Sequence, residues 1–143
     1  MQRRILFIED HDDTRELIKF VLESRGYSVT SDATVAAGLR HATASKFDLC
    51  LIDNWLPDGA GVELCEQIRA FDSLTPVLFY SGAASDADKM LAMQAGAQGY
   101  LAKPCSFVEL IRTIESLIAQ ATQRSLCPEA HGLVASSEVL TQR

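Results

Sequence analysis

Five short apolar runs alternate with longer amphipathic segments along this chain, and this alternation constrains its fold more than any other feature. The strand-like runs are Arg4–Ile8, Tyr27–Thr30, Leu49–Ile52, Val77–Tyr80 and Gly99–Ala102. Strands that alternate with helices are typical of a parallel sheet with helices on both faces. The third run is apolar throughout, as expected of a strand buried on both faces. The sequence therefore predicts an α/β fold built on a doubly wound, five-stranded parallel sheet.

The segments between these runs have the periodicity of helices. The last carries an apolar stripe at Phe107, Leu110, Ile111, Ile114 and Ile118. Its start, at Ser106 and Glu109, has the spacing of a capping box. The first helix carries a similar stripe at Leu17, Ile18, Val21 and Leu22, and Gly26 ends it. Weaker stripes predict two further helices at about Val35–Ala44 and Asp86–Ala95.

The apolar periodicity ends at about Ala121, which suggests a boundary in the chain. A length of 143 residues suits one domain. We interpret residues 1–121 as that domain and residues 122–143 as a C-terminal tail or linker. Within the tail, Pro128 and Gly132 are expected to break regular structure, and a brief helix is predicted at Ser136–Leu140. The sequence is compatible with a stand-alone domain and with an excised part of a longer protein.

Charge and cysteine content argue against several classes of protein. Lys and Arg number 13 against 19 Asp and Glu, and the net charge of −6 argues against direct binding of nucleic acid. No apolar run approaches the ~20 residues that span a bilayer, and the first ten residues lack the apolar region of a signal peptide. The four cysteines form no CxxC pair. Reduced thiols in a cytoplasmic protein without a membrane partner are therefore expected.

Polar residues follow four of the five strand-like runs. They are Glu9 and Asp10 after the first, Asp53 after the third, Ser81 after the fourth and Lys103 after the fifth. Because the carboxyl ends of parallel strands meet at one edge of a sheet, we expect these side chains to converge. Two carboxylates ~4 Å apart repel by about 4 kcal/mol at an effective dielectric of 20, so a proton or a cation must relieve them. Oxygen ligands favour Mg²⁺, with Mn²⁺ as the alternative.

The other groups at this edge suit a phosphate. Lys103 supplies a point positive charge and Ser81 a hydroxyl donor. Gly61 and Gly82 permit close backbone approach or a positive φ. Asp53 can act as a carboxylate nucleophile that forms an aspartyl phosphate. The residues thus predict phosphoryl chemistry centred on Asp53.

The motifs that carry these residues resemble those of the receiver domains of two-component response regulators. They are FIED with Glu9 and Asp10, LCLIDNWLPDGAG with Asp53, FYSGA with Ser81, and GYLAKP with Tyr100 and Lys103. The resemblance covers about Arg3 to Gln120. It implies a flavodoxin-like sheet in strand order 2-1-3-4-5 with five helices. It also implies a signalling switch, phosphorylated by a sensor histidine kinase or a phosphotransfer protein, that is not an enzyme beyond slow self-phosphorylation and self-dephosphorylation.

The resemblance further implies a role for each matching residue. Asp53 would accept the phosphoryl group, which Ser81 and Lys103 would contact. Mg²⁺ would be held by Glu9 (through water), Asp10, Asp53 and the main-chain carbonyl of Trp55. Ser81 and Tyr100 would form a switch pair, in which the hydroxyl moves toward the phosphate and the ring turns inward. The Lys103–Pro104 peptide bond would be cis.

Two docking surfaces are also implied by the resemblance. An unknown output protein would bind the face of the fourth helix, fifth strand and fifth helix, around Lys89–Gln98 and Tyr100. The kinase would dock beside the first helix and the loop after the fifth strand, near Arg15, Ile18 and Cys105.

Two other functions stay open at this point. A binding module of this fold could leave Asp53 unused. An aspartate-nucleophile phosphatase usually has a second acid two residues after the nucleophile, where this chain has Trp55. Structural roles are alternatives for single residues, because Glu9 and Asp10 could complement a helix N-terminus and Tyr100 could be a core aromatic.

Overall fold

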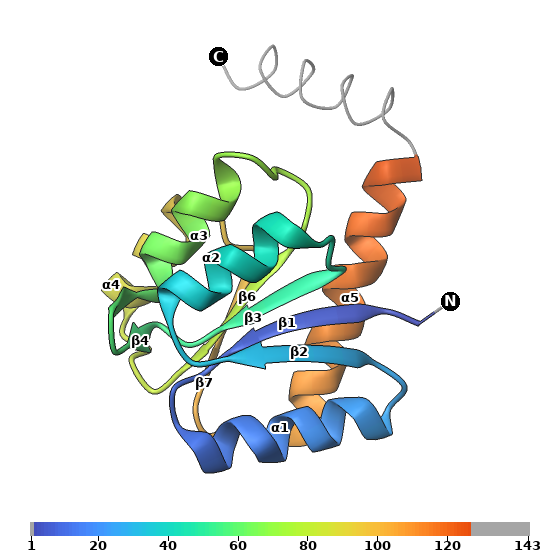
Figure 1. Cartoon of the computed structure of the whole chain (residues 1–143), viewed down its shortest axis with the longest axis horizontal. Coiled ribbons are helices and arrows are strands. Elements are labelled where there is room, and N and C mark those ends of the chain that lie inside the picture. The colour runs from blue at the N-terminus through green and yellow to red at the C-terminus, as the bar shows by residue number, and fades with distance from the viewer. Residues whose placement is uncertain (1, 127–143) are drawn as a thin grey trace.

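The computed structural model describes residues 2–126 and contains a sheet of five parallel strands (Figure 1). The strands are β1 (Arg4–Ile8), β2 (Ser28–Asp32), β3 (Leu49–Ile52), β6 (Val77–Ser81) and β7 (Gly99–Ala102). They lie in the order β2-β1-β3-β6-β7, and every neighbouring pair is parallel. Counted within this sheet, the order is 2-1-3-4-5, which confirms the predicted flavodoxin-like fold.

Five helices cover the two faces of the sheet in the described residues. They are α1 (Asp12–Ser24), α2 (Val35–Ala44), α3 (Gly61–Arg69), α4 (Asp86–Gln94) and α5 (Phe107–Leu126). Helices α1 and α5 lie on one face, and α2, α3 and α4 lie on the other (Figure 1). None of the helices within residues 2–126 is both long and apolar enough to cross a membrane.

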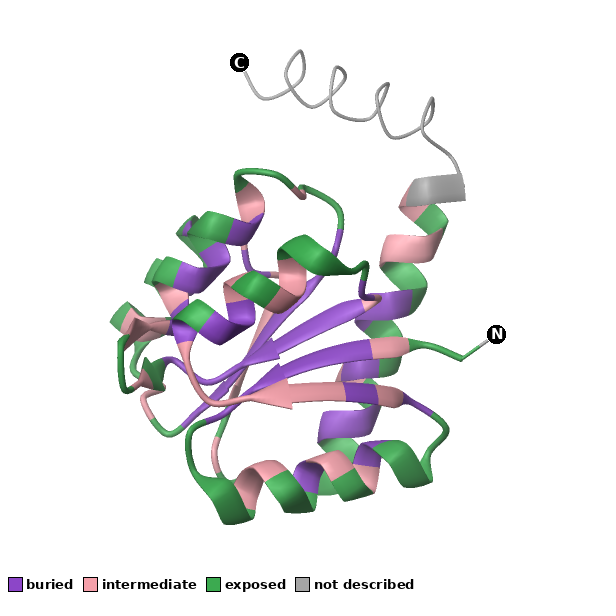
Figure 2. Cartoon of the chain, viewed as in Figure 1, coloured by how far each residue is buried: buried purple, intermediate pink, exposed green. Residues whose placement is uncertain are grey.

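The alternation of side chains along the central strands divides the apolar core in two. Ile5 and Phe7 of β1 pack with α1 and α5, whereas Leu6 and Ile8 pack with the helices of the other face. All four side chains are at most 1% exposed. Figure 2 shows the buried residues running along the central strands between the two helical layers. This double burial explains why residues 5–8 of β1 and all of β3 are apolar.

Two of the cysteines are core residues. Cys50 on β3 and Cys65 on α3 are at most 2% exposed. Burial raises the pKa of Cys50 to about 12 and the pKa of Cys65 to about 11. Both side chains are therefore protonated, free thiols at neutral pH.

The structure differs from the sequence predictions at several element boundaries. Strand β2 extends to Asp32 because its main chain continues to pair with β1 after the apolar residues end. Helix α5 continues past Ala121 to Leu126, since no Pro or Gly interrupts it although its buried residues stop at Ile118. Leu17 is 51% exposed, so α1 does not bury it with the rest of the predicted stripe. The helix predicted at 136–140 lies outside the described residues.

A short antiparallel hairpin follows β3 and has no counterpart in the sequence predictions. Its strands are β4 (Trp55–Leu56) and β5 (Gly59–Ala60). Asp58 lies in the turn of this hairpin. Its side chain accepts hydrogen bonds from the main-chain N–H groups of Val35 (2.7 Å) and Ala36 (3.0 Å), at the start of α2. These bonds, first that from Ala36 and then that from Val35, hold the pKa of Asp58 below its ordinary value. The hairpin is thereby tied to the N-terminus of α2.

Candidate functional site

The loops that follow β1, β3, β6 and β7 meet at one edge of the sheet and form a cleft of about 660 Å³. Six of the predicted site residues line it: Glu9, Asp10, Asp53, Trp55, Ser81 and Lys103. Their positions 10, 53 and 103 are thus brought together from distant parts of the chain. The parallel topology explains this convergence, because each residue lies at the carboxyl end of a strand or shortly after it.

Three carboxylates face one another in this cleft. Glu9, Asp10 and Asp53 each offer an oxygen atom, and these atoms all lie within 4.8 Å of one another. Glu9 is 1% exposed and Asp53 is 7% exposed, whereas Asp10 is exposed to solvent. Buried carboxylates are costly unless they are paired or coordinate a cation. The donor set consists of oxygens alone, which fits a hard divalent cation such as Mg²⁺.

Lys103 lies between the two buried acids. Its Nζ is 2.6 Å from Glu9 Oε1 and 3.2 Å from Asp53 Oδ2. Burial raises the pKa of Glu9 and repulsion by Asp53 adds to this, although Lys103 opposes both effects. Burial alone would lower the pKa of Lys103, but its pairing with Glu9 and Asp53 outweighs burial, so this pKa is raised. The ammonium group is therefore charged at neutral pH.

Main-chain N–H groups orient the remaining oxygens of the site. The N–H of His11 donates to Glu9 Oε2 at 3.2 Å, and the N–H of Trp55 donates to Asp53 Oδ1 at 3.3 Å. Each buried acid thus has one oxygen bonded to Lys103 and the other bonded to the main chain. The same loop geometry leaves the indole of Trp55 72% exposed at the rim of the cleft.

Ser81 is the last residue of β6, and Tyr100 is the second residue of the neighbouring strand β7. Ser81 is 1% exposed, and its Oγ accepts a hydrogen bond from the N–H of Ala83 at 3.2 Å. The ring of Tyr100 stacks on Phe79 with centroids 5.3 Å apart, and its hydroxyl donates to the main-chain carbonyl of Ala83. The ring is therefore turned inward, toward the loop that follows Ser81. Burial is the main cause that raises the pKa of Tyr100, so the phenol keeps its proton.

The side chain of Asn54, which no sequence pattern assigned to the site, borders it. It is 6% exposed, and its Nδ2 lies 3.5 Å from the hydroxyl oxygen of Tyr100. Its Oδ1 accepts a hydrogen bond from the N–H of Val62 at 3.3 Å. Its position in the sequence could have indicated this role. Asn54 directly follows Asp53, which comes after a buried strand, and a buried amide there needs hydrogen-bond partners inside the protein.

Gly61 and Gly82, which were predicted to permit close backbone approach or a positive φ, differ in the structure. A Cβ on Gly61 would lie 2.4 Å from the main-chain carbonyl oxygen of Asp53, which confirms the predicted close approach. A Cβ on Gly82 would meet nothing within 4 Å, and the φ of Gly82 is not positive. The prediction was therefore wrong for Gly82. The Lys103–Pro104 peptide bond is cis, as the resemblance implied.

The residues expected to contact a kinase also need a correction. Ile18 is 1% exposed because it packs into the core beneath α1, so it cannot contact a partner. Arg15 is engaged within the protein, where it donates to the carbonyl of Glu9 at 2.7 Å and to Asp12 Oδ1 at 2.6 Å. The exposed apolar residues of α1 are Leu17 and Phe20.

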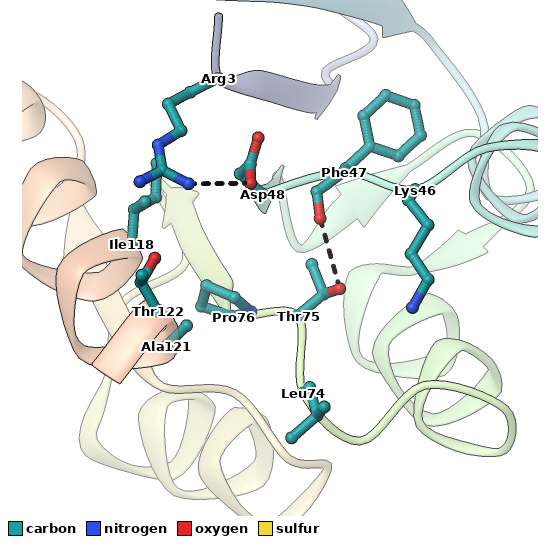
Figure 3. Close-up of a pocket in the computed structure, with 10 residues that line it drawn as sticks. All are labelled: Arg3, Lys46, Phe47, Asp48, Leu74, Thr75, Pro76, Ile118, Ala121 and Thr122. Atoms are coloured by element: carbon teal, nitrogen blue, oxygen red, sulfur yellow. Dashed lines mark hydrogen bonds and ion pairs between the residues drawn. The ribbon is translucent and has the colours of Figure 1, made fainter. Parts of the chain in front are cut away.

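A second cavity, of about 320 Å³, lies at the opposite edge of the sheet, before the first residues of β1, β3 and β6 (Figure 3). Two polar contacts join residues of its lining. Arg3 lies 3.4 Å from Asp48, and the hydroxyl oxygen of Thr75, which donates to Asp72 Oδ2 at 2.6 Å, lies 3.4 Å from the main-chain carbonyl oxygen of Phe47. This cavity has no group of facing carboxylates, so the chemistry predicted from the sequence belongs to the first cleft.

Comparisons with known proteins agree with this geometry. The model of the response regulator receiver domain matches residues 5–115. Among curated relatives, the transcriptional regulatory protein CseB of Streptomyces coelicolor is 36% identical over 117 residues, 82% of this chain and 50% of the relative. The KDP operon transcriptional regulatory protein KdpE of Escherichia coli is 37% identical over 106 residues, 74% and 47% of the two chains. This chain spans about half the length of these relatives.

Solved structures show the same architecture. A CheY-like receiver domain protein from Methanospirillum hungatei has a TM-score of 0.84 and 29% identity, with 87% of this chain and 99% of that chain covered. The receiver domain of a sensor histidine kinase from Pseudomonas aeruginosa, solved with a magnesium ion coordinated in its active-site cleft, has a TM-score of 0.78 and 31% identity, with 83% and 99% covered. With the sheet order, the strand-end residues and the matched family model in agreement, this chain belongs to the family of response regulator receiver domains.

Proposed function

We propose that this chain is a phosphorylation-controlled signalling switch that accepts a phosphoryl group on Asp53 with the help of Mg²⁺. The observation that carries the proposal is the meeting of Glu9, Asp10 and Asp53 in one cleft, where Lys103 pairs with Glu9 and Asp53. Membership of the receiver family supports it. A relative of the same fold that holds magnesium in its cleft supports the choice of metal.

The geometry of Asp53 suits a nucleophile. Its carboxylate lines the cleft, and both oxygens are held in place, one by the N–H of Trp55 and the other by Lys103. One oxygen attacks the phosphorus of a phosphohistidine, so that a P–O bond forms while the P–N bond breaks. The electron pair of the broken bond leaves with the imidazole, which takes up a proton from water. A carboxylate nucleophile needs no general base, so positioning and charge neutralisation supply the catalysis.

The remaining residues of the cleft neutralise the charge of the transferred group. Mg²⁺ held by Glu9, Asp10, Asp53 and the main-chain carbonyl of Trp55 would offset the negative charge of the acids and of the phosphoryl oxygens. Lys103 turns from the two acids to a phosphoryl oxygen. The hydroxyl of Ser81 then contacts a second oxygen, and Tyr100 occupies the inward position beside it.

Phosphorylation then changes which partner the protein binds. It biases an equilibrium between two packings of the cleft loops, and the output protein reads the face formed by α4, β7 and α5. On this face α4 exposes Met90, Leu91 and Met93. A sensor histidine kinase or phosphotransfer protein docks beside α1, which exposes Leu17 and Phe20. Residues 2–126 are not proposed to contact nucleic acid or membrane directly.

Phosphorylated Asp53 then loses its phosphoryl group by slow self-dephosphorylation, and the protein does not turn over a substrate. A phosphatase with an aspartate nucleophile uses a nearby acid to protonate the leaving group, and Trp55 occupies the position two residues after Asp53. We therefore expect no sustained hydrolysis of small phosphomonoesters.

The test uses the fluorescence of Trp55, the one Trp of the chain, which lines the cleft. Beryllofluoride or acetyl phosphate should change this fluorescence in the presence of Mg²⁺ and not in EDTA. The response should be absent in Asp53→Asn and unchanged in Asp48→Asn, a matched substitution at the opposite edge of the sheet. If Asp53→Asn responds like the unmodified protein, the acceptor is a different residue. Sustained release of phosphate from phosphomonoesters would favour the phosphatase instead.

A further inference from the structure

The side chain of Asn54 is held between the N-terminus of α3 and the ring of Tyr100. The N–H of Val62 donates to its Oδ1 at 3.3 Å, which decides the orientation of the amide. Its Nδ2 then points to the hydroxyl oxygen of Tyr100, 3.5 Å away. The main-chain carbonyl of Asn54 also accepts a hydrogen bond from the N–H of Gly61 at 2.8 Å. The oxygen of the amide is therefore held by α3, and its nitrogen is available to donate to the hydroxyl of Tyr100.

The hydroxyl of Tyr100 joins two loops that border the cleft. It accepts from Asn54, which directly follows Asp53, and donates to the carbonyl of Ala83, in the loop after Ser81. A phenol can do both at once, because its oxygen is an acceptor as well as a donor. The phenol thus links the side chain of the residue next to the nucleophile with the main-chain carbonyl of Ala83, two residues after the switch hydroxyl.

We infer that Asn54 is a positioning residue that favours the inward orientation of Tyr100. Asn54 is 6% exposed, so its amide group has little access to water. If the ring rotated outward, Nδ2 would lose its bond to the phenol, and a buried donor without a partner is unfavourable. The inward orientation avoids this cost. The inference rests on the proposed function, because the inward ring is the orientation assigned there to the phosphorylated protein.

This role has a consequence for activation. A receiver whose tyrosine is already held inward needs less free energy to reach the phosphorylated conformation. Loss of the amide should shift Tyr100 outward at rest and weaken the binding of a phosphoryl mimic. The expected weakening is about fivefold, the factor that corresponds to the net contribution of one buried hydrogen bond.

The experiment labels the full chain with 3-fluorotyrosine and records its fluorine NMR spectrum. The chain has three tyrosines, and Tyr100→Phe assigns the signal of interest. Asn54→Leu removes the amide at similar volume. The matched control is Thr75→Val, which removes a buried polar group that is 8% exposed and lies at the opposite edge of the sheet. Each protein is measured alone and during titration with beryllofluoride in Mg²⁺.

Asn54→Leu should move the Tyr100 signal toward its solvent-exposed position, increase its shift between H₂O and D₂O, and raise the half-saturating concentration of beryllofluoride about fivefold. Thr75→Val should change none of these. Asn54→Ser, whose short hydroxyl does not reach the phenol, replaces Asn54→Leu if the latter folds poorly. An unchanged Tyr100 signal in the Asn54 variants, or an equal change in Thr75→Val, would overturn the inference. A lack of response to beryllofluoride in the unmodified protein would instead count against the proposed function, while the resting Tyr100 signal still decides the role of Asn54.

Discussion

At the scale of single residues, the charge balance of the cleft depends on Lys103. Its ammonium lies within 3.2 Å of both buried acids, and it also lies over the ring of Tyr80 at 5.2 Å from the ring centroid. Glu9 is almost fully buried, so it depends on this one ammonium for charge compensation when no metal is bound. Removal of the ammonium therefore leaves a buried carboxylate beside a second one.

We predict that Lys103→Met destabilises the metal-free protein. The expected loss in the free energy of unfolding is about 2–4 kcal/mol, because breaking a buried ion pair leaves the partner charge uncompensated. We expect a loss in the lower part of this range, because the Lys103 side chain is 24% exposed and solvent screens part of its charge. Urea unfolding in EDTA measures the loss, with Lys89→Met on the exposed surface of α4 as the control. Equal losses in the two variants would show that the pairing with Glu9 does not carry the effect.

At the scale of elements, the start of α3 presses against the loop that carries the nucleophile. Gly61, the first residue of α3, approaches the main chain of Asp53 so closely that a Cβ would lie 2.4 Å from its carbonyl oxygen. The same Cβ would lie 3.0 Å from the Cα of Asn54. Backbone atoms cannot move aside as a flexible side chain does, so this contact fixes the position of Asp53 relative to α3.

Gly61→Ala should therefore shift the Asp53 loop. We expect a loss of about 2 kcal/mol in the free energy of unfolding, typical of overpacking in a tight contact. We also expect weaker binding of Mg²⁺, measured by titration of Trp55 fluorescence. Gly82→Ala is the matched control, because its Cβ would enter open space. A Gly61→Ala protein with the stability and Mg²⁺ affinity of Gly82→Ala would contradict the prediction.

The hairpin β4–β5 depends on its contact with α2. Asp58 receives two N–H groups of the first turn of α2, and its pKa is lowered below 3.8 chiefly by the bond from Ala36. A lowered pKa in the folded state means that the stabilisation is present above the unfolded pKa and is lost as the pH falls through the folded one.

Asp58→Ala should therefore lower the urea midpoint at neutral pH. The difference from the unmodified protein should shrink as the pH falls below 3.8, where Asp58 becomes protonated in the unmodified protein as well. Parallel urea titrations at neutral pH and at several values below pH 3.8 measure this. A difference that is independent of pH would indicate that the side chain contributes by packing rather than by accepting the two hydrogen bonds in its ionised form.

At the scale of the whole molecule, the sheet is stabilised by two apolar layers, and α5 closes one of them. Its buried side chains are Leu110, Ile111, Ile114, Leu117 and Ile118. All of them precede Ala121, although the helix continues to Leu126. This supports the proposal that residues 1–121 form the folded domain.

A chain that ends after Ala121 should fold like the full chain. We expect its free energy of unfolding to change by no more than about 1 kcal/mol, since the removed residues contribute little buried surface among those described. Its Trp55 fluorescence should respond to beryllofluoride as before. A chain that ends after Thr113 should fail to unfold cooperatively, because it lacks Ile114, Leu117 and Ile118. Loss of cooperative unfolding in the longer of the two chains would move the domain boundary beyond Ala121.

The alternation of apolar runs and the acids at strand ends were sufficient to predict the sheet and most of the cleft. Each depends on a local pattern, because strand and helix have different periods and parallel strands share one carboxyl edge. Glu9, Asp53 and Lys103 could therefore be placed together without any knowledge of their distances. The end of β2 at Asp32 could not be predicted, because it depends on pairing with β1 rather than on the polarity of its own residues.

Only the tertiary structure decided the contacts between segments that are distant in the chain. Asp58 bonds to the start of α2, Asn54 reaches Tyr100, and Ile18 faces the core instead of a partner. Such contacts depend on where two loops or helices lie after packing. The residues next to a side chain in the sequence do not predict that position. The chemistry at the strand ends was thus determined by the sequence alone, whereas the residues that orient it were determined by how the elements pack.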